Sequence, residues 1–169
     1  MKLSVKLLAT TILTAASLGA ANASLSGSVS YFSQSYGDGL KATGARFTLG
    51  YGFTVLNTLT VGPEFSYARG TLNRSSYNSD SYYDLSAGAF ANLRLNYDLI
   101  SPELRVSAGY AGAKFFNRNY LNGVYSQVGV GVNVLGSAYV GVSYRYTHLS
   151  NSNRDYSGSS YSFNLGFSF

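Results

Sequence analysis

The chain has 169 residues, carries charge on only 11% of them, and has a formal net charge of +5 at neutral pH. Soluble domains usually carry about twice this share of charge, and helical membrane proteins contain apolar runs of roughly 18 residues or more, which are missing after residue 23. The sequence contains no cysteine, which excludes disulfides and thiolate zinc sites. Because it also contains a single histidine, we expect neither a bound metal nor another cofactor. The many tyrosines, phenylalanines and glycines instead favour short alternating strands.

The first 23 residues have the three parts of a secretory signal peptide. A basic segment with Lys2 and Lys6 precedes an apolar stretch over residues 7–18. Residues 21–23 (Ala-Asn-Ala) match the small-x-small cleavage pattern, so we predict Sec-dependent export and cleavage after residue 23. A retained membrane anchor is the alternative, although the apolar stretch is short for a bilayer span.

Eight segments of the remaining sequence alternate between apolar and polar residues with a period of two. The second segment is the most regular, with apolar residues at every odd position from Ala45 to Val55 and polar or glycine residues between them. The first, fifth and seventh segments follow the rule less closely. Such alternation marks a sheet with one apolar face and one polar face. Pro63, in the third segment, removes a donor from the ladder, and we predict a β-bulge there.

The lengths of the segments and of their connections favour a membrane barrel over a soluble sandwich. The segments run to about 10–13 residues, whereas soluble strands usually hold 5–6 and tilted membrane strands need about 9–11. The connections alternate between short turns, at 56–57, 98–102 and 136–137, and longer polar loops, at 37–44, 71–82, 117–123 and 150–158. Aromatic residues also cluster near both ends of the apolar face. These features are typical of outer-membrane barrels.

We therefore predict an all-β fold, an eight-stranded antiparallel up-and-down transmembrane β-barrel formed by residues 24–169. Hydrocarbon cannot hydrogen-bond with an unpaired strand edge, and closing the sheet removes every edge. The whole mature chain resembles the OmpA/OmpX type of small barrel, which implies the bacterial outer membrane as its location, and we expect a monomer. The final aromatic strand, ending at Phe169, resembles the signal read by the barrel-assembly machinery, which is an expected partner.

The polar face carries seven charged residues that a barrel would turn into its lumen: Arg46, Glu64, Asp84, Arg94, Glu103, Arg105 and Arg145. The lumen of an eight-stranded barrel is only wide enough to be filled by side chains. An isolated charge there is costly, so we expect these residues to pair into a network that plugs the lumen. A gated ion path is the alternative.

The basic residues of the longer loops and adjoining strand ends suggest a lipid partner. After cleavage, ten basic and seven acidic side chains remain, an excess too mild to argue for nucleic-acid binding. Six basic residues lie on the long-loop side: Lys41, Arg69, Arg74, Lys114, Arg118 and Arg154. That end would face the outer leaflet, whose lipid A headgroups carry phosphates, so we expect contacts with outer-membrane lipid and lipopolysaccharide. Ordinary solvated loop charge is the alternative.

The segment His148-Leu149-Ser150-Asn151 is the sharpest chemical motif of the sequence. His148 and Ser150 project from the apolar face of the seventh strand, at the rim where the strand leaves the outer leaflet. A serine beside a histidine is the minimum for an activated nucleophile, and Asn151 can add an oxyanion donor. The alternative is a pair of amphipathic rim residues without a chemical role.

Over about residues 139–169 the chain resembles the lipid A 3-O-deacylases (PagL-like enzymes), eight-stranded barrels with a His-x-Ser-Asn motif late in the sequence. The resemblance implies that Ser150 is the nucleophile, His148 the general base and Asn151 an oxyanion contributor. The family also uses a glutamate on the last strand to orient its histidine.

The chain departs from this family at the glutamate. Alignment on Tyr161 places Ser159 at that position, and the nearest acidic residue is the loop residue Asp155. In serine proteases, loss of the carboxylate that orients the catalytic histidine lowers the rate by about 10⁴. We therefore expect a non-enzymatic outer-membrane barrel with a structural or surface-interaction role. A lipid A deacylase is the alternative, and a narrow pore is disfavoured.

Overall fold

The structure, a computed structural model, describes residues 23–37, 39–73, 79–95, 97, 99–115, 119–151 and 154–168. Within these ranges no helix is both long enough and apolar enough to cross a membrane. The expected signal peptide, apart from Ala23, lies outside the described residues, and so does Phe169.

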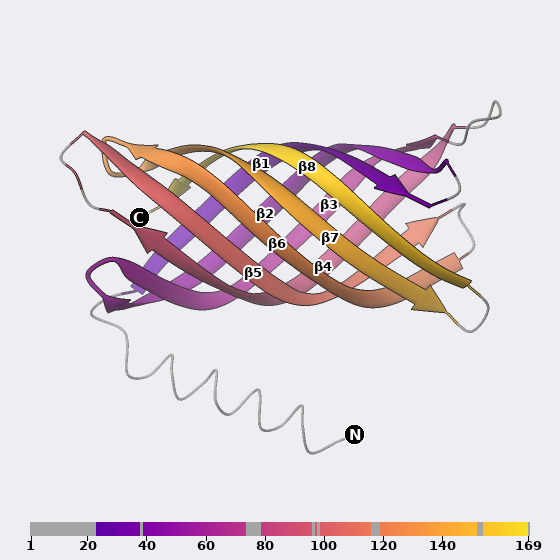
Figure 1. The fold of residues 1–169 in the computed structure, drawn as a ribbon, viewed down its shortest axis with the longest axis horizontal. Coiled ribbons are helices and arrows are strands. Elements are labelled where there is room, and N and C mark those ends of the chain that lie inside the picture. The colour runs from indigo at the N-terminus through magenta and orange to yellow at the C-terminus, as the bar shows by residue number, and fades with distance from the viewer. Residues whose placement is uncertain are drawn as a thin grey trace, which may run out of the picture.

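Eight antiparallel strands form one closed barrel (Figure 1). Their bounds are β1 (Ala23–Tyr36), β2 (Lys41–Leu56), β3 (Leu59–Asn73), β4 (Ser79–Arg94), β5 (Ile100–Phe115), β6 (Asn119–Val134), β7 (Ala138–Asn151) and β8 (Arg154–Ser168). Each strand pairs with its sequence neighbours, and β1 pairs with β8 from Ser26–Ser168 to Tyr36–Gly158, which closes the sheet. The predicted fold class is therefore confirmed.

Short connections join the strands at both ends of the barrel. Residues 57–58 and 135–137 form tight turns, and the β4–β5 connection lies at the same end. In the β6–β7 turn, Leu135 and Gly136 have φ values of 52° and 77°. Two successive left-handed residues match the twist of a two-residue hairpin, and glycine adopts this conformation without strain. We call this end the turn end and the opposite end the loop end. The loop-end connections, at 37–40, 74–78, 116–118 and 152–153, are shorter than the polar loops that the sequence predicted, because the strands extend into them.

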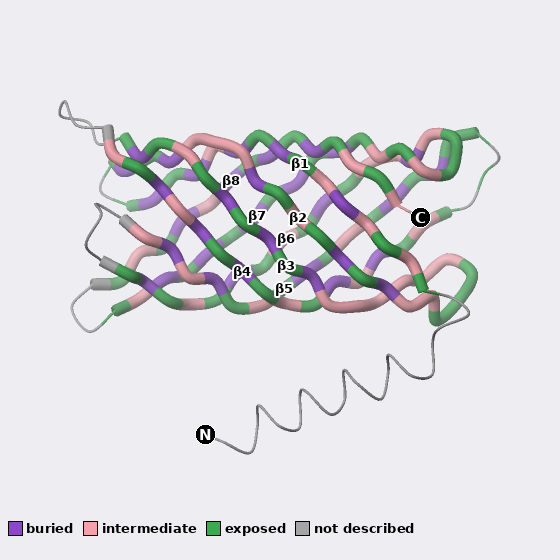
Figure 2. The backbone as a smooth tube through the Cα atoms, turned by 180° about the vertical axis from the view of Figure 1, so that it is seen from behind, coloured by how far each residue is buried: buried purple, intermediate pink, exposed green. Residues whose placement is uncertain are grey.

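The outer surface is apolar over most of the barrel wall. Figure 2 shows buried and exposed residues alternating along each strand. Large apolar side chains such as Leu49, Val130 and Phe163 are more than half exposed on this surface. Aromatic residues also pair across strands there, as in Tyr144 and Tyr161, whose ring centroids lie 5.2 Å apart. An apolar belt of this kind fits contact with acyl chains.

The predicted bulge at Pro63 is wrong. The pairs between β2 and β3 keep one register from Gly50 to Phe53, across the segment opposite Pro63, and Pro63 itself pairs with β4. The register shift lies nearer the turn, between Thr54 and Leu56. Proline removes a donor from the ladder without adding a residue, whereas a bulge requires an additional residue in one strand.

The loop end of the lumen is filled mainly by apolar and aromatic side chains, with the polar residues Gln34 and Thr147 fully buried among them. We define the apolar plug as the buried cluster of Phe32, Tyr36, Leu40, Ala42, Ala68, Leu72, Tyr82, Ala111, Ala113, Leu121, Tyr125 and Leu149. Most of these residues occupy inward positions near the loop ends of their strands, where the pattern predicted a polar face. The predicted filling of the lumen by polar and charged side chains therefore holds only for part of it, because the apolar plug closes the loop end.

The plug makes a testable contribution to stability. Leu149 is fully buried in the plug, so Leu149→Ala leaves a cavity and is expected to lower the free energy of unfolding by about 2–5 kcal/mol. Leu165→Ala is the matched control on the outer surface, where Leu165 is 52% exposed. Surrounding acyl chains fill the space left there, so we expect a smaller loss. Urea unfolding in detergent micelles measures both; equal losses would contradict the plug.

Candidate functional site

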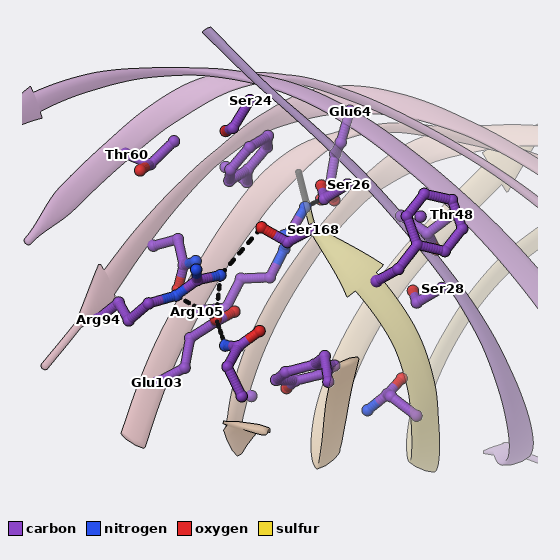
Figure 3. A pocket seen from close by; sticks show the side chains of 18 of the residues that line it. Ser24, Ser26, Ser28, Thr48, Thr60, Glu64, Arg94, Glu103, Arg105 and Ser168 are labelled. Carbon is purple, nitrogen blue, oxygen red and sulfur yellow. Dashed lines mark hydrogen bonds and ion pairs between the residues drawn. The ribbon is translucent and has the colours of Figure 1, made fainter. Parts of the chain in front are cut away.

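Below the plug, toward the turn end, the lumen widens into a polar chamber of about 280 Å³ (Figure 3). Serine and threonine hydroxyls of β1, β2 and β3 line one wall, among them Ser26, Thr48 and Thr60. The turn residues Asn57 and Gly136 also line it, so the chamber reaches the turn end of the barrel. An eight-stranded barrel leaves such a space when small side chains face inward.

Three ion pairs join six of the seven predicted lumen charges: Arg94–Glu103 (3.1 Å), Arg105–Glu64 (2.9 Å) and Arg145–Asp84 (3.6 Å). The first two border the chamber. The third lies deeper, where both side chains are at most 1% exposed. Every carboxylate of the predicted network therefore has an arginine partner, as a low-dielectric interior requires.

Hydrogen bonds from other strands, two of them across the lumen, hold the two chamber pairs in place. Arg94 donates to Ser168 (3.1 Å) as well as to Glu103, and Figure 3 shows these contacts near the turn end. Asn133 Nδ2 donates to the same Glu103 oxygen. The hydroxyl of Tyr125 donates to Glu64 at 2.9 Å, so this carboxylate is bound by a guanidinium and a phenol.

Aromatic side chains cover one guanidinium group in the chamber and one at the boundary between chamber and plug. Arg105 lies 3.9 Å from the ring centroid of Phe90, and Arg145 lies 4.0 Å from that of Tyr125. Asp84, the partner of Arg145, also accepts a hydrogen bond from the Tyr82 hydroxyl at 3.1 Å. Stacking and hydrogen bonding together keep these charges in fixed positions.

Arg46 is the one predicted lumen charge that has no carboxylate partner among the described residues. Its guanidinium lies 4.9 Å from the Phe32 ring centroid, on the chamber side of the plug. The network thus consists of three ion pairs and one arginine, Arg46, outside them.

A second cluster lies on the outer rim, where β7 and β8 pair. His148 is exposed on the outer surface, and its Nδ1 lies 2.9 Å from Ser157 Oγ. Ser150 is two residues along the same face and stands opposite Asp155 in the ladder. No hydrogen bond or ion pair among the described residues joins His148 to Ser150 or Asp155. The expected nucleophile and base therefore share a face without being in contact.

Ser157 is the rim residue that the sequence motif did not reveal. The register pairs Ser157 directly with His148, whereas Ser159, the position expected from alignment, pairs with Tyr146. Only knowledge of the register across the β7–β8 loop would have revealed this contact, because a shift of one residue reverses every side chain. Asn151 ends β7 opposite Arg154.

A row of alternating cations and tyrosines crosses the outer surface near the loop end. Arg69, Tyr83, Lys114 and Tyr120 are successive partners across β3, β4, β5 and β6. Arg69 lies 5.6 Å from the Tyr83 ring centroid, and Lys114 lies 5.4 Å from that of Tyr120. We call these four residues the cation–tyrosine row. Lys41 is exposed at the start of β2, while Arg74 and Arg118 lie outside the described residues.

The described part of the chain contains no group of three histidine, aspartate or glutamate side chains arranged to hold a metal ion. The chemistry that these residues offer is electrostatic binding in the chamber and at the cation–tyrosine row, and hydroxyl–imidazole chemistry at the rim.

The Arg105–Glu64 pair provides a test of the lumen network. Arg105→Met leaves the Glu64 carboxylate, only 6% exposed, without its cation, and should lower the free energy of unfolding by about 1.5–3 kcal/mol. Adding Glu64→Gln removes the uncompensated charge and should recover most of this loss. Urea unfolding of the single and double variants measures the recovery. A double variant as unstable as the sum of both single variants would contradict a coupled pair.

The comparisons with known proteins address the fold. No family model matches the chain, and no curated protein matches it. Solved structures do resemble it. Neisserial surface protein A is 17% identical over 86% of this chain and 95% of its own, with a TM-score of 0.64. Ail, the attachment invasion locus protein of Yersinia pestis, is 19% identical over 87% and 97%, with a TM-score of 0.58.

A third solved structure of the same shape is an enzyme. The outer membrane enzyme PagL is 18% identical over 82% of this chain and 97% of its own, with a TM-score of 0.53. Likeness at this level of identity shows a shared fold. The chain therefore has the fold of the small eight-stranded outer-membrane β-barrels.

Proposed function

We propose that the chain is a non-conducting barrel of the bacterial outer membrane that holds its loops at the cell surface and contacts lipopolysaccharide. The observation that carries this proposal is the apolar plug across the loop end of the lumen. Phe32, Leu72 and Tyr82 are fully buried in the plug. An ion crossing this region would exchange its hydration shell for apolar side chains, which costs many kcal/mol. The polar chamber thus ends blindly beneath the plug.

Contact with lipopolysaccharide is supported by the cation–tyrosine row. Arg69 and Lys114 stand on the outer face near the loop end, with a tyrosine between them. Tyrosines favour the interface between acyl chains and headgroups, and cations there attract phosphates. The backbones of Arg69 and Lys114, on alternate strands, lie about 9.6 Å apart, at twice the usual spacing between strands. This spacing suits the two ends of a bisphosphorylated headgroup.

The route to the membrane belongs to the same proposal. Residues 1–23 direct Sec-dependent export, and the barrel-assembly machinery inserts the chain through the final strand and Phe169. Closure of β1 onto β8 leaves no unpaired strand edge, which supports a monomer.

Planar-bilayer recordings test the blind lumen. Folded wild-type protein is expected to give no stable current steps in potassium chloride, because the plug excludes ions. Combined replacement of Phe32 and Leu72 by serine should give small conductance steps. Replacement of the outward-facing Phe163 by serine is the matched control and should remain silent. Persistent steps from wild-type protein would contradict the proposal.

A second candidate function, ester hydrolysis at the outer leaflet, is favoured by the contact between His148 and Ser157. Nδ1 of the imidazole is held at 2.9 Å by a hydroxyl, where hydrolases place an orienting group. This leaves Nε2 for the Ser150 hydroxyl, which would attack an acyl ester after losing its proton to His148. Asn151 would donate to the developing oxyanion. A serine in the orienting place stabilises the imidazolium less than a carboxylate does.

Fatty-acid release from lipid A separates the two candidates. The non-conducting barrel proposal expects no 3-hydroxy fatty acid above the background of a His148→Ala variant. The hydrolase candidate expects slow release that Ser150→Ala abolishes. Ser157→Ala would then reduce the rate, and Ser159→Ala, on the same strand but opposite Tyr146, would leave it unchanged. Release that survives Ser150→Ala would rule out the assigned nucleophile.

A further inference from the structure

Arg46 is a buried cation whose hydrogen-bonding capacity is largely unused. The residue is 3% exposed, and its Nε and Nη2 atoms are buried without a hydrogen-bond partner. One face of its guanidinium is directed to the Phe32 ring. Arginine cannot lose its proton under ordinary conditions, so the charge persists inside the barrel.

The charge balance of the lumen is uneven by one unit. The predicted network contains four arginines and three carboxylates, and the three ion pairs use every carboxylate. Asp84 attracts Arg46 electrostatically, but no ion pair joins them: its Oδ1 lies 3.6 Å from Arg145, and its Oδ2 accepts a hydrogen bond from the Tyr82 hydroxyl. A buried and uncompensated charge destabilises a fold by several kcal/mol, and a bound counterion relieves this penalty.

The surroundings of Arg46 suit a small oxyanion. Arg46 lines the chamber, and its neighbour across the ladder is Ser30, which in turn pairs with Asn164. Ser162, two residues from Asn164 on the same face of β8 and the ladder partner of Phe32, also lines the chamber and has a buried hydroxyl without a hydrogen-bond partner. A guanidinium edge and a hydroxyl are donors that match the oxygens of phosphate, sulfate or a carboxylate.

We propose that the chamber is a binding site for a small oxyanion, held by the Nε–Nη2 edge of Arg46 and the hydroxyl of Ser162. The anion enters from the turn end, because the chamber reaches the turn residues Asn57 and Gly136 while the plug closes the other end. Its charge completes the balance of the lumen. This site is separate from the outer rim and does not depend on whether the barrel hydrolyses esters.

Calorimetric titration with inorganic phosphate tests the proposal. The folded barrel is placed in non-ionic detergent with chloride as the only other anion, and ionic strength is held constant. Wild-type protein is expected to bind one phosphate per barrel. Arg46→Met should weaken binding at least tenfold, and Arg46→Lys should weaken it less, because an ammonium keeps the charge but loses the two-donor edge.

Three further variants separate the lumen from other phosphate sites. Ser162→Ala removes a hydroxyl that has no partner, so it should weaken binding several-fold without unfolding the barrel. Ser159→Ala, on the same strand but outside the chamber lining, is the matched control and should leave the affinity unchanged. Arg69→Met reports any phosphate that is bound at the cation–tyrosine row instead. If binding fell with Arg69→Met and not with Arg46→Met, phosphate would be bound at the rim and the proposal would be overturned.

Unfolding measurements supply a readout that does not depend on calorimetry. Phosphate should raise the urea midpoint of the wild-type barrel, since it binds only the folded state, and should leave the midpoint of Arg46→Met unchanged. If Arg46→Met does not fold, the comparison of wild type with Ser162→Ala gives the same test. Absence of any phosphate-dependent heat or midpoint shift in the wild-type protein would refute the site.

Discussion

A peptide group in hydrocarbon finds no hydrogen-bond partner except another peptide group, and this constraint organises the whole molecule. The pairing of β1 with β8 satisfies it by closing the sheet. Closure then divides every strand into two faces, because successive side chains point to opposite sides. The outer face meets acyl chains and is apolar. The inner face is free to differ along the barrel, and the proposed non-conducting lumen and anion site depend on how it does so.

The interior of this barrel has two parts with different physical roles. The apolar plug gains stability by burying side chains such as Leu72 and Leu149 and closes the loop end. The chamber instead holds Arg94–Glu103 and Arg105–Glu64, partly exposed toward the turn end. Between the two parts, Arg145 and Asp84 form a pair from which solvent is nearly excluded. A lumen built in this way favours binding from one end over conduction through both.

Much of the fold was predictable because a period of two is a strong local signal. The alternation predicted eight strands, their apolar faces and the seven charges directed inward. It did not predict the plug, because inward leucines and alanines such as Leu121 and Ala113 disturb the alternation only at strand ends. The sequence did not predict which arginine pairs with which carboxylate when the two lie on strands that are not neighbours. Arg105 of β5 and Glu64 of β3 form such a pair.

The rim site was only partly predictable for a related reason. That His148 and Ser150 share a face follows from sequence spacing alone. The contact of His148 with Ser157 follows from the register of β7 and β8, which depends on the geometry of the loop between them. Pro63 shows the same limit, since the loss of a ladder donor does not reveal whether a strand gains a residue.

The central claim, a barrel with a lipid-facing wall and a lumen sealed at the loop end, is tested most directly by cysteine scanning. The chain contains no cysteine, so each introduced thiol reports on one position. Along β7 in lipid vesicles, cysteines that replace Val142 or Tyr144 should react only with a membrane-soluble thiol reagent. A cysteine that replaces Ser143, in the chamber, should react with a small water-soluble reagent. A cysteine that replaces Thr147, which is fully buried, should react with neither reagent. Reaction of the cysteine at position 147 or 142 with the water-soluble reagent would contradict the account.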